Sequence, residues 1–339
     1  MQTLRSAAMV SRSTDHSVSA KTLRQWCAPE VILVVTNLVD ELVLMPQVIN
    51  QARYNRAKIV LAHVVTPEEW KPLCRKPDRS NCRIQEARAI LDRMARQLRW
   101  LGFTCEPLVL SGRPEVGIPS LARSCCVDRV VVGFEDNPDL TTGNKPALAE
   151  LLLPLMEVPT CVIGRLASFS RNMFTRSITL AISQDSECDV QLGFASRLAQ
   201  ELHARLTLLH VFNRKDEDES PQTAEAFVSW LPSPTWREAE LFCPAEIRVR
   251  EGDPADEILK YCASTNQDLL ILCSPGVMPG RSWRTSASYR VLSGAQCPVI
   301  VLGKQAGFVD IIGSDAMAPE KLCAYGESPA ESFRNEAGI

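Results

Sequence analysis

The chain carries one sequence pattern twice, and this repeat limits the folds that it can adopt. Leu61 to Val65 returns as Leu208 to Phe212, with a histidine at the third place of each run. Gly112-Arg113-Pro114 returns about 140 residues later as Gly252-Asp253-Pro254. A solenoid repeats every ~20–50 residues, so a spacing this long predicts two copies of a whole domain.

Three further landmarks recur in the same order along both halves. Because their order and spacing agree, we expect the two halves to share one strand order, with His63 equivalent to His210 and Gly112 to Gly252. The landmarks are Val31 to Val35 with Ile178 to Ile182, Asp128 to Gly133 with Asp268 to Cys273, and Pro159 to Gly164 with Pro298 to Gly303.

Segments with apolar residues at helical spacing separate the short apolar runs of each half. Gly102 follows one such segment, at the place where a left-handed helix end favours glycine. This alternation is typical of a parallel sheet flanked by helices. The apolar stripes are Ala87, Ile90, Leu91, Met94, Leu98 and Leu101 in the first half, and Leu192, Ala195, Leu198, Ala199 and Leu202 in the second.

The pattern predicts an α/β fold of two tandem doubly wound domains, each a five-stranded parallel sheet. The strand runs are apolar on both faces, so helices should cover both sides of each sheet. Right-handed crossovers then wind the layer in two directions. Such sheets bind ligands at the carboxyl ends of their strands, where the winding direction reverses.

The extent of the repeat predicts five segments. We expect a disordered extension over 1–28, a first domain over 29–165, a linker over 166–175, and a second domain over 176–304. The acidic segment 305–339 has no periodic pattern and is predicted to be a disordered tail.

Charge and hydropathy exclude two classes of protein. A formal net charge of −3 argues against nucleic-acid binding, which usually requires a basic excess. No run of about 18 apolar residues occurs, so we expect no membrane span. Residues 1–28 lack the apolar core of a secretory signal, although a transit peptide has a similar composition. We therefore expect a cytoplasmic protein.

Cysteine usage agrees with a reducing compartment. The 13 cysteines are odd in number and form no Cys-x-x-Cys pair. Cys105, Cys161, Cys262 and Cys297 lie inside the expected strands and helices or at their ends. We expect reduced, buried thiols rather than disulfides.

The order of these motifs resembles the universal stress protein family. The resemblance rests on the opening apolar strand, a second strand that closes on His-Val, Gly252 to Leu259, Asp268 before an apolar strand, and Cys297 to Val301. It covers roughly 29–165 and 176–304, and two copies resemble double-domain members of the family. It implies a non-catalytic binding or regulatory protein of the stress response.

Members of that family that bind ATP share a Gly-x-x-Gly loop after the fourth strand, then nine residues, then Gly-Ser or Gly-Thr at the start of the last helix. Glycines let backbone N–H groups approach the phosphates, and a helix start presents free N–H groups. In the family an aspartate at the end of the first strand holds the adenosine.

The second half keeps part of this motif, and we expect at best residual ATP binding there. Ordinary turns with solvated Arg281 and Arg284 are the alternative interpretation. The resemblance places Cys273 and Gly276 at the two loop glycines, Thr285 and Ser286 at the Gly-Ser pair, Ser183 at the aspartate and Val211 beside the base.

The first half departs further from the motif. Gly133 is kept, but Asp136 replaces the second glycine, Pro146-Ala147 replaces Gly-Ser, and Asn37 stands at the aspartate position. Acidic side chains in this loop would repel a triphosphate. We expect nucleotide binding to be lost in this half. The one cofactor that the resemblance implies is therefore ATP in the second half.

Catalysis and partners complete the expectations. His63 and His210 lack a matched nucleophile motif and are interpreted as structural. The alternative function is a weak ATPase or autophosphorylating protein that uses the second half only. The last strands, Cys161 to Gly164 and Pro298 to Gly303, resemble the edges through which family domains pair, so we expect either internal pairing of the two halves or a homodimer.

Overall fold

The computed structural model describes residues 20–38, 41–66, 78–134, 147–164, 166–167, 174–183, 188–213, 221–231, 243–273 and 286–303. The first half contains α1 (Ala20–Cys27), β1 (Val31–Val35), α2 (Glu41–Ala52), β2 (Lys58–Val65), α4 (Asp78–Trp100), β3 (Cys105–Ser111), α5 (Pro114–Ser124), β4 (Arg129–Phe134), α6 (Leu148–Leu152), the 3₁₀ helix η1 (Leu153–Leu155) and β5 (Thr160–Gly164). The second half contains β6 (Ser177–Ile182), α7 (Asp189–Leu202), β7 (Arg205–Phe212), α8 (Ala224–Trp230), β8 (Ala245–Glu251), α10 (Pro254–Thr265), β9 (Leu269–Cys273), α11 (Ala287–Gly294) and β10 (Val299–Leu302).

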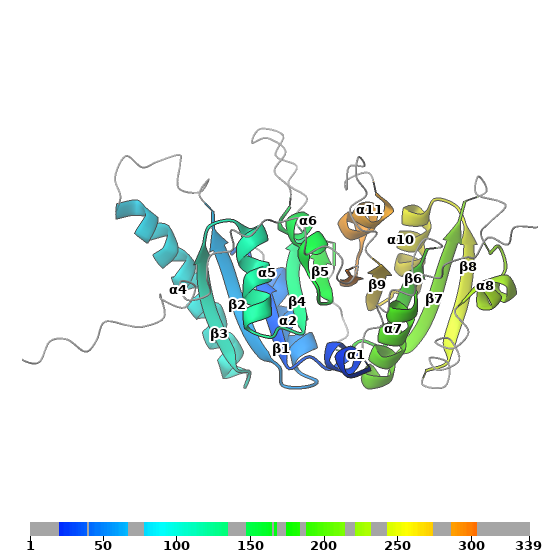
Figure 1. The fold of residues 1–339 in the computed structure, drawn as a ribbon, viewed down its shortest axis with the longest axis horizontal. Coiled ribbons are helices and arrows are strands. Elements are labelled where there is room, and N and C mark those ends of the chain that lie inside the picture. Colours follow the sequence, from blue (N-terminus) through cyan, green and yellow to red (C-terminus); the bar gives the residue numbers. More distant parts are fainter. Residues whose placement is uncertain are drawn as a thin grey trace, which may run out of the picture. The chain divides into compact units, whose positions relative to one another are not determined.

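The strands form a ten-stranded sheet in the order β3-β2-β1-β4-β5-β10-β9-β6-β7-β8 (Figure 1). Each half is parallel and has the same strand order, read from opposite ends. The predicted α/β class, with two doubly wound five-stranded layers, is therefore confirmed. Between the halves, β5 and β10 lie side by side and antiparallel.

Helices cover both faces of the sheet, as the apolar strands require. Ile32 and Val34 of β1 face a core to which α1, α2, α4, α7 and α8 contribute. Leu33 and Val35 face the opposite core, which α5, α6, α10 and α11 cover. Each core contains residues of both halves, so the hydrophobic interior is continuous across the β5 and β10 pair.

The predicted helices are confirmed, with one difference at a helix end. Leu91, Met94 and Leu98 of α4 are fully buried, and Gly102 adopts φ +90° after the helix. Leu101 was expected on the same apolar stripe, but it is 48% exposed. It lies beyond the last residue of α4, where the chain already turns away from the helical phase.

The first strand of each half is aligned differently from the sequence prediction. We matched Val31 to Ile178 by apolar character, but the hydrogen bonds match Val31 to Ser177. The carboxylate of Asp128 accepts the N–H groups of Glu30 and Val31, at 2.8 and 3.0 Å. Asp268 accepts the equivalent N–H groups of Arg176 and Ser177, at 2.9 and 3.1 Å.

These two aspartates fix the entry to the first strand of each half. Each carboxylate precedes the fourth strand and satisfies two backbone N–H groups of a neighbouring strand more than 90 residues away. Ser177 adds a hydroxyl that donates to Asp268 at 3.0 Å. Because unpaired backbone N–H groups are costly when buried, the aspartates stabilise the register of the sheet.

A histidine joins the ends of the first two strands in each half. The Nδ1–H of His63 donates to the carbonyl of Thr36 at 2.8 Å, and that of His210 donates to the carbonyl of Ile182 at 3.0 Å. Both rings are buried, with exposed fractions of 7% and 1%. His210 also stacks on Phe227 of α8, with ring centroids 5.0 Å apart. The structure thus supports the structural interpretation of both histidines.

The turn after the third strand is also repeated. Gly112 and Gly252 have φ values of +129° and +146°, which side chains rarely adopt. Their N–H groups donate to the carbonyls of Val65 and Phe212, at 3.1 and 2.9 Å. This confirms the predicted equivalence of the two Gly-x-Pro motifs.

The described cysteines form no disulfide. Cys105, Cys161, Cys262 and Cys297 are buried, as expected from their place in the pattern. Burial raises the pKa of Cys105 and Cys161 to about 11, so both thiols are protonated at neutral pH. Within the described residues, no helix has the length and hydropathy needed to cross a bilayer.

The N-terminal prediction needs a correction. Residues 20–27, expected within a disordered extension, form α1. Trp26 and Cys27 are buried in the core that α7 shares, and the Cys27 thiol donates to the carbonyl of Phe194 at 3.5 Å. Apolar side chains at the end of α1 thus give this segment a tertiary partner. Residues 1–19, most of the predicted linker and the predicted tail lie outside the described residues.

The repeated aspartates yield a stability prediction. Asp128→Ala or Asp268→Ala leaves two backbone N–H groups without their acceptor, so each should lower the free energy of unfolding by about 1.5–3 kcal/mol. Asp92→Ala on α4 is the control, with an expected change within about 0.5 kcal/mol. Urea denaturation checks this, and equal values for Asp128→Ala and Asp92→Ala would contradict the role of the carboxylate.

His210 yields a pH prediction. Burial lowers the pKa of His210 below 6.5, against a smaller opposing effect of its bond to Ile182. Between the lowered pKa and 6.5 the unfolded chain binds more protons, so this histidine makes the folded state less stable as pH falls through that window. The stability difference between wild type and His210→Asn should therefore shrink from pH 7.5 to pH 5.5 in urea denaturation. His203→Asn is the matched histidine replacement at an exposed position, where asparagine also tolerates the φ of 52°.

Candidate functional site

The candidate site lies at the carboxyl ends of β6 and β9, where the winding direction of the second half reverses. β6 pairs with β7 on one side and with β9 on the other. α7, which follows β6, packs on one face of the sheet, and α11, which follows β9, packs on the other. The two helices therefore follow neighbouring strands but pack on opposite faces of the sheet. Doubly wound sheets bind ligands at the point where such helices separate.

The sheet register brings three of the predicted site residues, Ser183, Val211 and Cys273, to within one residue of the same level. Ile182 pairs with His210, so Ser183 lies level with Val211 on the neighbouring strand. Ala181 pairs with Leu272, so Ile182 lies level with Cys273, the last residue of β9. Ser183 is exposed and Val211 is half-buried. The structure therefore places Ser183, Val211 and the end of β9 along one edge.

Ser286 begins α11, the helix that leads back from this edge. Its side-chain oxygen accepts the N–H of Tyr289 at 3.1 Å, which makes it the N-cap of the helix. A capping hydroxyl still has its own hydrogen to donate. Gly276 and Thr285, the other predicted phosphate contacts, lie outside the described residues.

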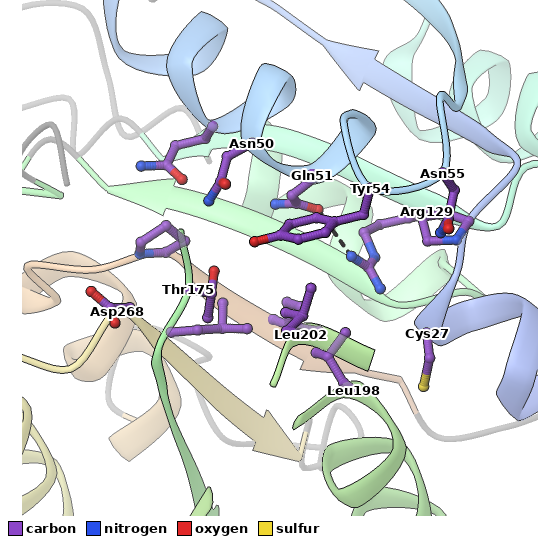
Figure 2. Close-up of a pocket in the computed structure, with 15 residues that line it drawn as sticks. Cys27, Asn50, Gln51, Tyr54, Asn55, Arg129, Thr175, Leu198, Leu202 and Asp268 are labelled. Atoms are coloured by element: carbon purple, nitrogen blue, oxygen red, sulfur yellow. Dashed lines mark hydrogen bonds between the residues drawn. The ribbon is translucent and has the colours of Figure 1, made fainter. Parts of the chain in front are cut away.

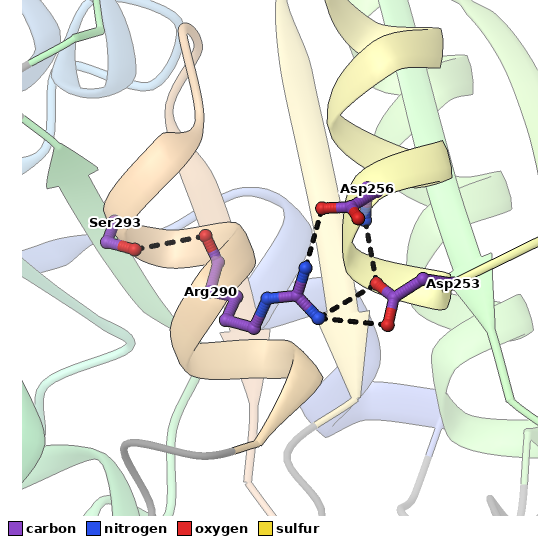
Figure 3. Close-up of polar contacts among 4 residues, drawn as sticks. All are labelled: Asp253, Asp256, Arg290 and Ser293. Carbon is purple, nitrogen blue, oxygen red and sulfur yellow. Dashed lines mark hydrogen bonds and ion pairs between the residues drawn. The ribbon is translucent and has the colours of Figure 1, made fainter.

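Two contacts hold α11 in place, and sequence reasoning found neither. The ring of Tyr289 meets the ring of Phe134 from β4, with centroids 5.5 Å apart at 69°. The Arg290 guanidinium donates to both carboxylate oxygens of Asp253 at 2.9 Å and to Asp256 at 2.6 Å (Figure 3). These partners are far apart in sequence, and an isolated arginine or aromatic residue gives no local signal of them.

The Asp253 carboxylate serves two helices at once. It caps α10 by accepting the N–H of Asp256 at 3.1 Å, while Arg290 of α11 binds both of its oxygens. Partial burial tends to raise the pKa of Asp253, but the backbone N–H of Asp256 and the Arg290 guanidinium hold it below its usual value. The carboxylate stays ionised at neutral pH and links α10 to α11.

The equivalent edge of the first half has a different composition. Asn37 follows the first strand and is half-buried, and the next strand ends with buried Val64 and Val65. Phe134 directly follows Gly133, the first loop position, and its ring is 2% exposed. Phe134 of the first half therefore packs on α11 of the second half. Asp136 and Pro146 lie outside the described residues.

Comparison with known proteins agrees with this architecture. Residues 175–303 match the universal stress protein family. The crystal structure of a universal stress protein from Archaeoglobus fulgidus DSM 4304 is 15% identical with a TM-score of 0.65, over 81% of this chain and 99% of that one. A protein of unknown function from Pseudomonas aeruginosa PAO1 is 16% identical with a TM-score of 0.53, over 83% of this chain and 94% of that one. No curated protein matches the sequence.

The two structural likenesses show the fold, since they extend over both halves. The family match adds that the sequence of the second half is similar to universal stress proteins. The matched residues include all the candidate site residues of that half. The first half repeats the strand order, the aspartate, the histidine and the glycine turn of the second. On this evidence residues 175–303 match the universal stress protein family, and the first half has the same fold.

Proposed function

We propose that this protein is a non-catalytic regulatory module of the stress response that binds a purine nucleotide, weakly and in its second half only. The observation that supports the proposal is that Ser183 and the end of β9 lie at the carboxyl edge of the sheet, and that α11, capped by Ser286, is the next described helix after β9. The N-terminus of α11 points N–H groups toward this edge, a favourable place for phosphate. The resemblance of this half to ATP-binding members of the universal stress protein family, which residues 175–303 match, favours the same ligand class.

The first half serves as a structural partner in this proposal. Phe134, the residue after Gly133, is buried and its ring packs on Tyr289 of the second half. Asn37 at the end of the first strand supplies no carboxylate for a ribose. Asp136 and Pro146 in the following loop disfavour a triphosphate by charge and by loss of a backbone N–H.

Binding without hydrolysis is the simpler proposal for the described groups. His210 lies two residues before the end of β7, but its ring is buried and its Nδ1–H is bonded to the carbonyl of Ile182. A general base must reach the proton that it removes. If the wild-type chain released inorganic phosphate from ATP and the Gly276→Asp variant did not, the ATPase alternative would be favoured instead.

The setting of the protein is also proposed. Free, protonated thiols such as Cys105 and Cys161 support a reducing compartment, so we propose that the protein acts in the cytoplasm. The antiparallel pair of β5 and β10 uses both last-strand edges within one chain. We therefore propose internal pairing of the halves instead of a homodimer through these edges, with the protein partner still to be identified.

Nucleotide titration tests the function directly. ATP, ADP, AMP and cyclic AMP are added to the full chain, and binding is read by calorimetry and by thermal shift. We expect saturable stabilisation by at least one of them, because a ligand that binds only the folded state stabilises it by mass action. Gly276→Asp should abolish saturation while the fold is kept, because its carboxylate repels phosphate. Asp136→Gly at the matching place in the first half is the control and should change the affinity little; a larger gain there would contradict the assignment.

A gain-of-function variant tests the base end of the site. Ser183 occupies the position of the family aspartate at the exposed end of β6. Ser183→Asp should strengthen nucleotide binding roughly 10-fold, because a hydrogen bond to a charged group contributes about 1.5–3 kcal/mol. Asn37→Asp makes the matched change in the first half and should have no effect. Equal gains in both variants, measured by calorimetry with the tightest nucleotide, would refute a site confined to the second half.

A further inference from the structure

A small cavity lies at the opposite edge of the sheet from the candidate nucleotide site. Among its lining residues are Pro29, Asp268 and Pro298, which precede the strands β1, β9 and β10. Gln51 and Arg129 come from the first half, while Leu198 and Leu202 come from α7 of the second (Figure 2). Its volume of about 30 Å³ exceeds what a single water requires but cannot hold a nucleotide.

Arg129 is the charged group that the interior has to accommodate. Its side chain begins β4 and is 3% exposed. One terminal nitrogen donates to Oε1 of Gln51 at 3.3 Å, and the other donates to the carbonyl of Trp26. The Nε–H is buried and has no partner among the described residues. A guanidinium has five N–H donors, so the two bonds leave most of its capacity unused.

No anionic side chain of the described residues forms an ion pair with this guanidinium. Cys27 and Cys161 lie close enough to influence it, but burial raises the pKa of Cys27 to about 12 and that of Cys161 to about 11, so both are neutral. Asp128 and Asp268 are engaged through Oδ2 with backbone N–H groups at the strand starts. A buried charge without a counter-ion is unfavourable in a protein interior.

The remaining lining suits a small anion. Asn50, Tyr54, Asn55 and Thr175 bring amide and hydroxyl groups that can donate hydrogen bonds to the cavity. Their neutrality allows an anion to take its countercharge from Arg129 alone. Asp268 is acidic and also lines the cavity, but its Oδ2 accepts three donors from Arg176 and Ser177.

We propose that this cavity binds one monatomic anion, chloride in solution, beside the Nε–H of Arg129. The ion supplies the missing countercharge at a point where residues of both halves meet. The ion therefore stabilises the contact of α1 and α7 with β4. This contact joins the two halves in addition to the pairing of β5 with β10. The site is independent of the nucleotide proposal, because it lies at the amino ends of the strands.

Thermal unfolding at constant ionic strength tests the site. Sodium chloride replaces sodium gluconate, whose anion is too large for the cavity. Above the dissociation constant, each tenfold rise in chloride should raise the Tm by about 2–4 °C, from mass action and the usual Tm response of a protein of this size. Arg129→Met should remove this dependence, while the exposed Arg290→Met keeps it.

A measurement on the wild-type chain covers the case in which Arg129→Met does not fold. Crystals soaked in sodium bromide should show an anomalous peak beside the Arg129 guanidinium, and bromide should replace chloride in the Tm assay. Equal Tm values in chloride and gluconate overturn the proposal. It is equally overturned by a chloride effect that survives in Arg129→Met, or by water alone in the cavity of the bromide-soaked crystal.

Discussion

The antiparallel pairing of β5 with β10 is the interaction on which the rest of the structure depends. Val162 pairs with Val299, Cys161 with Ile300 and Thr160 with Val301. Each of these strands ends a parallel layer and would otherwise expose a row of unpaired backbone groups beside apolar side chains. Pairing them joins two five-stranded layers into one sheet and lets each hydrophobic core continue from one half into the other.

The two halves of the joined sheet share their scaffold groups but differ at the carboxyl edge. Scaffold groups are repeated in both: an aspartate that binds two backbone N–H groups, a histidine bonded to the neighbouring strand, and a glycine at positive φ. The groups at the carboxyl edge are not repeated, since Asn37 corresponds to Ser183 and Phe134 corresponds to Ser274 in the sequence. Folding depends on the buried scaffold, whereas exposed edge residues can change with little effect on stability.

α11 is the element through which the halves influence the candidate site. Its first turn contains the Ser286 cap and Tyr289, whose ring meets Phe134 of the other half. Arg290, the next residue, is bound to Asp253 and Asp256 of α10. Under the proposed function, a ligand at the start of α11 would contact a helix that is already positioned from two sides, which would lower the ordering cost of binding.

The sequence by itself determined the architecture of each half. The repeat predicted a common strand order, the helical stripes predicted α4 and α7, and the family resemblance directed attention to Ser183, Cys273 and Ser286. These features are local or repeated, so the periodicity of side chains records them. The phosphate contacts Gly276 and Thr285 stay predictions, because both residues lie outside the described part of the chain. The domain boundaries also stay predictions.

Only the tertiary structure decided the features that depend on distant partners. The alignment of Val31 with Ser177 differs by one residue from the apolar match, because a strand buried on both faces has no alternation to fix its phase and the Asp268 hydrogen bonds set it instead. The same holds for α1, for the Phe134 and Tyr289 contact, and for the burial of Arg129 between the halves. Each arises from packing between segments far apart in the chain, and a local pattern of hydrophobic and polar residues does not specify which surfaces will meet.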